Sequence, residues 1–236
     1  MTSTTLDALD LSALLCSRVC HDVISPVGAI VNGLEVLEDE SDASMREFAL
    51  DLIRKSARQA SARLQFVRIA FGAAGSAGAS IDLADAEKVS RGMFGDEKTQ
   101  LTWSAPQALY PKNKVKLLLN LVMIATGAIP RGGVLDVQVS GDGEAPLIVL
   151  RAKGSHARIP PHVESLIAGE PEHGVDAHGI LAYYAGLVAR AAAMDVRFSI
   201  DGDTVTIRSE SSGAAPTDEP IIGVPLNVGS SDTALA

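Results

Sequence analysis

One histidine occupies a chemically favourable position in a helical pattern. The apolar residues around His21 recur every three or four positions, which predicts an amphipathic helix over residues 6–38. At about 100° per residue, the apolar stripe lies opposite His21, so the imidazole is expected to face solvent. Neutral imidazole is a nucleophile near neutral pH and can accept a phosphoryl group, although many surface histidines have no chemical role. The stripe consists of Cys16, Val19, Val23, Val27, Ile30, Leu34 and Leu37.

Four polar neighbours are candidates to assist His21. Adjacent helical residues do not face one another, so we expect Asp22 to act through its field or on a partner rather than by a hydrogen bond to the ring. Arg18, one turn earlier, shares the face of His21 and is placed either to screen phosphoryl charge or to pair with an acid of a partner. Ser17 and Ser25, four residues to either side, also share this face, and simple solvation explains them equally well.

A proline interrupts the same helix. Pro26 lies five residues after His21, and the apolar stripe continues beyond it. Proline has no amide hydrogen, and in a helix interior it costs about 3 kcal/mol. The missing hydrogen bond would have reached the carbonyl of Asp22. We therefore predict a kink and a loosened backbone beside the histidine.

The elements that must position these residues form two predicted domains. A second helix over 44–71, joined to the first by the short polar link 39–42, predicts an antiparallel hairpin. Small residues at 72–78 mark a linker, which gives a hairpin domain at 1–75 and a second domain at 80–236. The second domain is expected to be α+β, with a loose tail from about residue 210 in which the apolar segment 221–226 either packs back on its own domain or meets a partner. Its helices are expected at 83–93, 112–128, 160–168 and 178–194, and its strands at 101–104, 134–140, 147–151, 196–200 and 204–208.

The hairpin cannot bury its own apolar side chains. Two helices leave both stripes partly uncovered, and a second copy would complete a four-helix bundle, so a homodimer is expected. The second helix is also basic, which is typical of a solvated face or of a surface that docks an acidic partner. Its apolar set includes Phe48, Leu52, Ile53, Leu64 and Val67, and its cations are Arg46, Arg54, Lys55, Arg58, Arg63 and Arg68.

Composition excludes several classes of function. The 236 residues carry a net charge of -9, which argues against binding to nucleic acid or to an anionic membrane. The apolar runs at 117–130 and 180–194 are shorter than the roughly 20 residues of a bilayer span, and the polar N-terminus does not look like a signal peptide. Cys16 and Cys20 lack a second pair of metal ligands and are expected to be reduced thiols. A soluble, cytoplasmic protein is expected.

The segment around His21 carries a family resemblance. His21-Asp22-Val23-Ile24-Ser25-Pro26-Val27 resembles the H-box of sensor histidine kinases, except that a basic or amide residue is usual where Ile24 stands. Residues 15–35 are similar to histidine phosphotransferases of the ChpT type, which act in alphaproteobacterial cell-cycle phosphorelays. The resemblance implies that His21 takes a phosphoryl group from the receiver domain of a hybrid histidine kinase and passes it to response regulators like CtrA and CpdR. The receivers are expected to bring Mg²⁺, so no cofactor or metal is expected on this chain.

The same resemblance allows a search for the kinase nucleotide site in the second domain. That domain resembles a degenerate histidine-kinase ATP-binding (Bergerat) domain, an α/β sandwich, with Asn120 at the first asparagine of the N-box. The chemical groups that hold metal, phosphate and adenine are absent, since Ile and Ala supply no such ligand. An ATP-independent phosphotransferase is therefore expected, and an atypical active kinase, a non-catalytic scaffold and a sporulation-type phosphotransferase are the alternatives. The replaced positions are Ile124, Gly127, Ala152 and His156, and the phosphate lid is reduced to His178-Gly179-Ile180.

Overall fold

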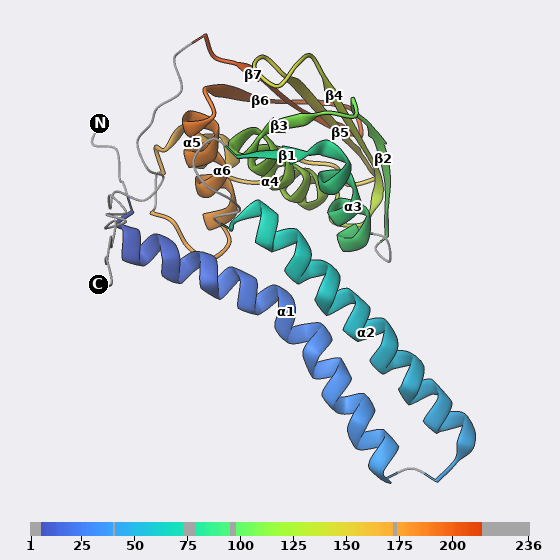
Figure 1. Ribbon diagram of the computed structural model, residues 1–236. Coiled ribbons are helices and arrows are strands. Elements are labelled where there is room, and N and C mark those ends of the chain that lie inside the picture. The colour runs from blue at the N-terminus through green and yellow to red at the C-terminus, as the bar shows by residue number, and fades with distance from the viewer. Residues whose placement is uncertain (1–5, 40, 73–78, 95–97, 172–173, 214–236) are drawn as a thin grey trace, which may run out of the picture.

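A helical hairpin projects from an α/β domain in the computed structural model, which describes residues 6–39, 41–72, 79–94, 98–171 and 174–213 (Figure 1). Helix α1 spans Ala8–Asp39 and α2 spans Ala43–Ala70. Both lie within two residues of the predicted ranges, because the apolar periodicity is long and regular. Helix α1 runs through Pro26 without a break and bends along its length (Figure 1), as proline-containing helices do.

Side-chain caps define the tip of the hairpin. The Asp42 carboxylate accepts hydrogen bonds from the amides of Ser44 and Met45, which caps the N-terminus of α2. Arg46 donates to the carbonyl of Leu37, in the last turn of α1, where helical carbonyls lack partners. The polar link predicted at 39–42 therefore closes the hairpin through these side chains.

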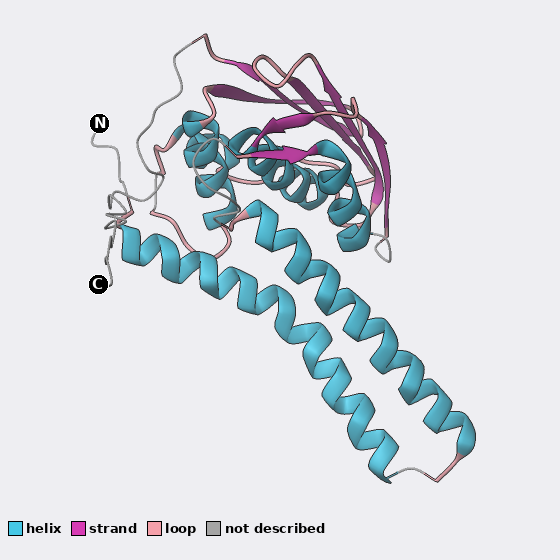
Figure 2. Ribbon diagram, viewed as in Figure 1, coloured by secondary structure: helices cyan, strands magenta, loops and turns pink. Residues whose placement is uncertain are grey.

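The second domain is a sheet covered by helices on one face, as Figure 2 shows. The sheet order is β2-β4-β5-β7-β6, in which β2 and β4 are parallel and the other neighbours antiparallel. This arrangement confirms the α+β class. The strands are β2 (Thr99–Ser104), β4 (Gly133–Ser140), β5 (Leu147–Lys153), β6 (Met194–Asp201) and β7 (Thr204–Ser211), and the helices are α3 (Leu83–Phe94), α4 (Lys112–Ala128), α5 (Val163–Ala168) and α6 (Ile180–Ala191).

A small ribbon was not expected from the sequence. Strands β1 (Ser80–Asp82) and β3 (Leu109–Pro111) pair antiparallel. Three residues are too few to show the alternation that identifies a strand. The prediction also began α5 too early, since residues 160–162 are not helical, and ended α6 too late, since Met194 starts β6. The predicted linker at 73–78 and the segment 221–226 lie outside the described residues.

The base of the hairpin shares one core with the α/β domain. Leu11 of α1 and Phe66 of α2 belong to the same buried cluster as Leu118 of α4 and Tyr183 of α6. The amide of Leu6 donates to the Tyr183 hydroxyl at 3.1 Å. The hairpin is therefore held on the domain by packing as well as by the chain.

Further from the domain, α1 leaves its apolar stripe largely uncovered. The α1 residues buried against the rest of the chain are Leu11, Asp22, Pro26 and Gly33. The predicted stripe lies beside this contact face rather than within it, so that Val27 and Leu34 remain 45% and 47% exposed. By length and composition alone α1 would also qualify as a membrane span, but only 6% of its most apolar window is buried within one chain. An amphipathic helix whose apolar face packs against a second chain would also combine an apolar composition with low burial within one chain.

Candidate functional site

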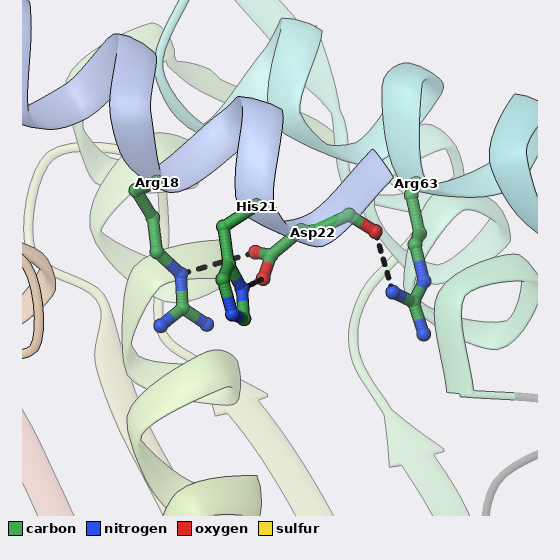
Figure 3. A network of polar contacts seen from close by, with 4 residues as sticks. All are labelled: Arg18, His21, Asp22 and Arg63. Carbon is green, nitrogen blue, oxygen red and sulfur yellow. Dashed lines mark hydrogen bonds and ion pairs between the residues drawn. The ribbon is translucent and has the colours of Figure 1, made fainter. Parts of the chain in front are cut away.

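The imidazole of His21 projects from the middle of α1 into solvent, as predicted (Figure 3). Its side chain is 84% exposed. Within the described residues, Nδ1 has one polar contact, with Asp22, and Nε2 has no hydrogen-bond partner. The ring therefore offers a free nitrogen to an incoming group.

Asp22 contacts the ring directly, which corrects our expectation. Its Oδ1 lies 3.4 Å from Nδ1 of His21, near the long limit for a hydrogen bond. The two residues point about 100° apart around the helix, but the two side chains still bring these polar atoms together. A carboxylate at Nδ1 accepts the Nδ1–H hydrogen and favours the tautomer whose lone pair is on Nε2.

Arg18 completes this arrangement from one turn earlier. Its Nε donates to Oδ2 of Asp22 at 3.1 Å, so each carboxylate oxygen has its own partner. The Asp22 residue is only 9% exposed, and a buried carboxylate needs such a partner. Arg18 thus pairs with an acid of its own helix, whereas we had expected it to meet phosphoryl charge or an acid on a partner.

Arg63 holds the backbone of the site, and sequence reasoning did not identify it. It lies on α2, and its Nη1 donates to the main-chain carbonyl of Asp22 (Figure 3). This carbonyl is the acceptor that Pro26 leaves without an amide. The Asp22 carbonyl is therefore not left without a donor, because a side chain from the other helix replaces the missing amide. Pro26 indicated which carbonyl needed a donor, but the donor lies 41 residues away in sequence.

The two serines are not drawn into this network. Ser17 and Ser25 are both exposed on α1, and neither has a hydrogen bond from its hydroxyl within the described residues. They border the histidine on either side along the helix. Their exposure is consistent with solvation, and neither hydroxyl is hydrogen-bonded to the imidazole.

Some of the residues that were compared with the kinase nucleotide site line a cavity. Ile124, Gly127, His178 and Gly179 line a space of about 580 Å³, together with Arg18. Most of the other described lining residues are apolar, and Asp176 is the only acid among them. Its carboxylate already accepts the amides of His178 and Gly179, which lowers its pKa.

The other residues that were compared with the kinase nucleotide site lie outside this cavity. Ala152 is fully buried in β5, and His156 is exposed in a loop. Asn120 is fully buried, and its Nδ2 donates to the carbonyls of Ala70, at 3.1 Å, and Lys116, at 2.8 Å. The asparagine thus ties the last residue of α2 to α4.

The cysteines agree with the expectation of free thiols. Cys16 and Cys20 are exposed on α1 and are not joined in a disulfide. A hydrogen bond that the Cys20 thiol donates to Cys16, together with the negative charge of an ionised Cys16, raises the pKa of Cys20. In the part of the chain that the structure describes, no three His, Cys, Asp or Glu side chains gather as they would around a metal ion.

Comparisons with known proteins point to one class of protein. Residues 83–204 match the family model of the histidine phosphotransferase C-terminal domain. The chain is 51% identical over 207 residues to the protein phosphotransferase ChpT of Brucella abortus, covering 87% of this chain and 98% of that protein. A bacterial phosphotransferase of known structure superimposes with a TM-score of 0.81 at 48% identity, covering 89% of this chain and all of that one.

Proposed function

The chain belongs to the histidine phosphotransferase family, and from this premise we propose that His21 is the residue that carries the phosphoryl group in a phosphorelay. The observation that carries the proposal is the geometry of the ring. Nδ1 contacts Asp22 at 3.4 Å, while the side chain is 84% exposed. The nitrogen that must meet a partner's phosphate is the one that faces solvent.

The transfer step follows from that geometry. The Nε2 lone pair attacks the phosphorus of an aspartyl phosphate, so the N–P bond forms as the bond from phosphorus to the aspartate oxygen breaks. The aspartate leaves as a carboxylate, and the ring keeps its proton on Nδ1, beside Asp22. The carboxylate stabilises the positive ring that results. Passing the group to a second aspartate reverses these steps, and in-line placement supplies most of the catalysis.

The partners are proposed to be receiver domains. The donor is the receiver of a hybrid histidine kinase, and the acceptors are response regulators of the CtrA and CpdR type. Each receiver supplies its own Mg²⁺, since carboxylates are the ligands that Mg²⁺ prefers. The exposed cations of α2, such as Arg54 and Arg58, suit an acidic docking surface.

The proposed relay does not use ATP. The cavity that contains Ile124 and Gly127 is mainly apolar, and Asp176 is already engaged by two amides. Ala152, one of the positions replaced relative to the kinase nucleotide site, is buried in the sheet. Apart from Asp176, the described residues that line the cavity offer no carboxylate or amide oxygen to hold a metal ion between phosphates.

A homodimer in the cytoplasm is the proposed assembly. Most of the large apolar side chains that remain exposed in one chain lie on the hairpin. Such a concentration of apolar surface marks an interface. A second hairpin would cover it and form a four-helix bundle. The side chains concerned are Leu9, Ile24, Val27, Val31, Leu34, Met45, Phe48, Leu50 and Leu64.

A relay assay tests the phosphoryl carrier. The chain is mixed with a receiver domain phosphorylated on its aspartate and with a second, unphosphorylated receiver. We expect label to reach the second receiver through wild type and through His178→Gln, but not through His21→Gln. His178 is the matched control because its side chain is also solvent-exposed, at 95%.

Three outcomes would contradict parts of the proposal. Transfer through His21→Gln equal to wild type would remove His21 from the relay and leave a scaffold role. Labelling of the chain by radiolabelled ATP alone, lost in His21→Gln, would show an active kinase instead. Sedimentation at the mass of one chain would contradict the dimer.

A further inference from the structure

The cavity that contains Ile124 and Gly127 has a mainly apolar lining. Met123, Leu166 and Leu181 contribute to it, and they are 7%, 7% and 9% exposed. The volume of about 580 Å³ lies within the usual range of ligand sites. Because the described lining residues supply few groups for metal or phosphate, an occupant with aliphatic side chains suits this cavity better than a nucleotide does.

One cation at the edge of this cavity has hydrogen-bonding capacity to spare. Arg18 donates to Asp22 through Nε, and its two terminal nitrogens are turned away from that carboxylate (Figure 3). Within the described residues, these two nitrogens have no hydrogen bond or ion pair. Asp176, the only acid among the described lining residues, accepts two amides of its own loop. The cavity therefore complements an apolar occupant that carries a negative charge close by.

The C-terminal tail, residues 214–236, has this composition and lies outside the described residues. Its apolar segment 221–226 reads Ile-Ile-Gly-Val-Pro-Leu, and the acids Asp218 and Glu219 come shortly before it. The tail contains no Lys, Arg or His. Prolines before and within the segment restrict the free chain, which reduces the conformational entropy lost on binding.

The described end of the chain lies within reach of this cavity. The amide of Ser212 donates to the carbonyl of Ala193 at 2.9 Å, which places the end of β7 at the C-terminal end of α6. The cavity lies at the other end of α6, a helix of 12 residues and about 18 Å. Gly213 and Ile221 are eight residues apart and can span up to about 26–29 Å. Covalent attachment also gives the segment an effective concentration on the order of millimolar.

We propose that residues 221–226 dock in this cavity of their own chain. Their aliphatic side chains pack against Met123 and Leu181, and Asp218 and Glu219 lie beside the free edge of Arg18. The tail thereby fills the region that was compared with the kinase nucleotide site. This interaction is separate from phosphotransfer and does not depend on it. The tail of a second copy and a partner protein are the competing occupants.

Photochemical cross-linking of the full chain tests this proposal. A benzophenone side chain at position 227 leaves the apolar segment intact. After irradiation, we expect mass spectrometry to find links within one chain to Met123 or to residues 160–182. Ile221→Asp with Ile222→Asp should lower the yield by about tenfold or more, because it places charges against an apolar surface. Ser230→Asp with Ser231→Asp adds the same charge beyond the segment and should leave the yield unchanged.

Two further variants test the cavity and the charges. A Cβ at Gly127 would meet nothing within 4 Å, so a larger side chain there fits the fold and takes up space in the cavity. Gly127→Leu should lower the yield by about tenfold, whereas Gly127→Ala should change it little. Asp218→Asn with Glu219→Gln should lower the yield about two- to fivefold, as an exposed ion pair implies.

The same experiment contains the results that would overturn the proposal. Links that all fall outside the cavity, or a yield unaffected by Ile221→Asp with Ile222→Asp, would exclude docking of this segment. Products of twice the chain mass would assign the cavity to the tail of a second copy. No link in the isolated chain, together with slower transfer from a phosphorylated receiver in Gly127→Leu, would assign the cavity to a partner protein.

Discussion

Arg63 donates a hydrogen bond to the main-chain carbonyl of Asp22, one helix away, at the position where Pro26 removes the helical donor. The contact fixes the backbone that carries both His21 and Asp22. Because a proline in α1 creates the acceptor and an arginine in α2 satisfies it, the two residues act as a pair. Their effects on the relay should therefore not be additive.

A double-mutant cycle measures this coupling. We expect Arg63→Ala to lower the rate of transfer through His21 by about tenfold, since a hydrogen bond from a charged donor contributes about 1.5–3 kcal/mol. Pro26→Ala restores the amide of residue 26 to the Asp22 carbonyl. In that background Arg63→Ala should cost much less, as measured by rapid-quench transfer from a phosphorylated receiver. Equal losses in both backgrounds would show that Arg63 acts elsewhere.

Removing the charge of Asp22 while keeping its shape distinguishes an electrostatic role from simple packing. Asp22→Asn keeps the shape but weakens the acceptor at Nδ1 of His21 and the ion pair with Arg18. We expect phosphoryl transfer to slow by about ten- to a hundredfold, as the loss of a charge-assisted contact implies. Asp51→Asn, an exposed acid on α2, is the control and should transfer as wild type does. Transfer by Asp22→Asn at the wild-type rate would leave Asp22 a purely structural residue.

Asn120 should matter to stability more than to ligand binding. Asn120→Ala removes the donor to the carbonyls of Ala70 and Lys116. The Lys116 carbonyl keeps its helical amide partner, but the Ala70 carbonyl at the end of α2 loses this donor. The loss of a buried donor costs about 1–3 kcal/mol, so urea unfolding should begin at a lower concentration. Asn32→Ala, at an exposed position of α1, should change the midpoint little. If Asn120→Ala unfolded like wild type, the tie between α2 and α4 would be energetically neutral.

Two glycines of α1 should respond oppositely to alanine. A Cβ at Gly33 would lie 2.7 Å from Cγ1 of Ile53, so Gly33→Ala must push α1 from α2 and should destabilise by about 1–3 kcal/mol. A Cβ at Gly28 would meet nothing within 4 Å. Gly28→Ala should therefore stabilise the helix by about 0.5–1 kcal/mol. Thermal unfolding measures both, and a stabilising Gly33→Ala would contradict the close packing of the hairpin.

The sequence by itself determined the elements that depend on local periodicity. Both long helices, helix α4 and the strands β6 and β7 follow from spacing and turn residues close together in the chain. The exposure of His21 follows as well, because the wheel angle between a residue and an apolar stripe is a local property. The resemblance around His21 correctly indicated the family.

Only the tertiary structure decided which distant groups meet. Arg63 reaches Asp22 across 41 residues and Asn120 reaches Ala70 across 50. These partners depend on the register of one helix against another, and no local pattern encodes that register. The same limit applies to the β1–β3 ribbon, whose strands are too short for periodicity. Local spacing identified the exposed histidine, whereas packing supplied the groups that hold the backbone beside it.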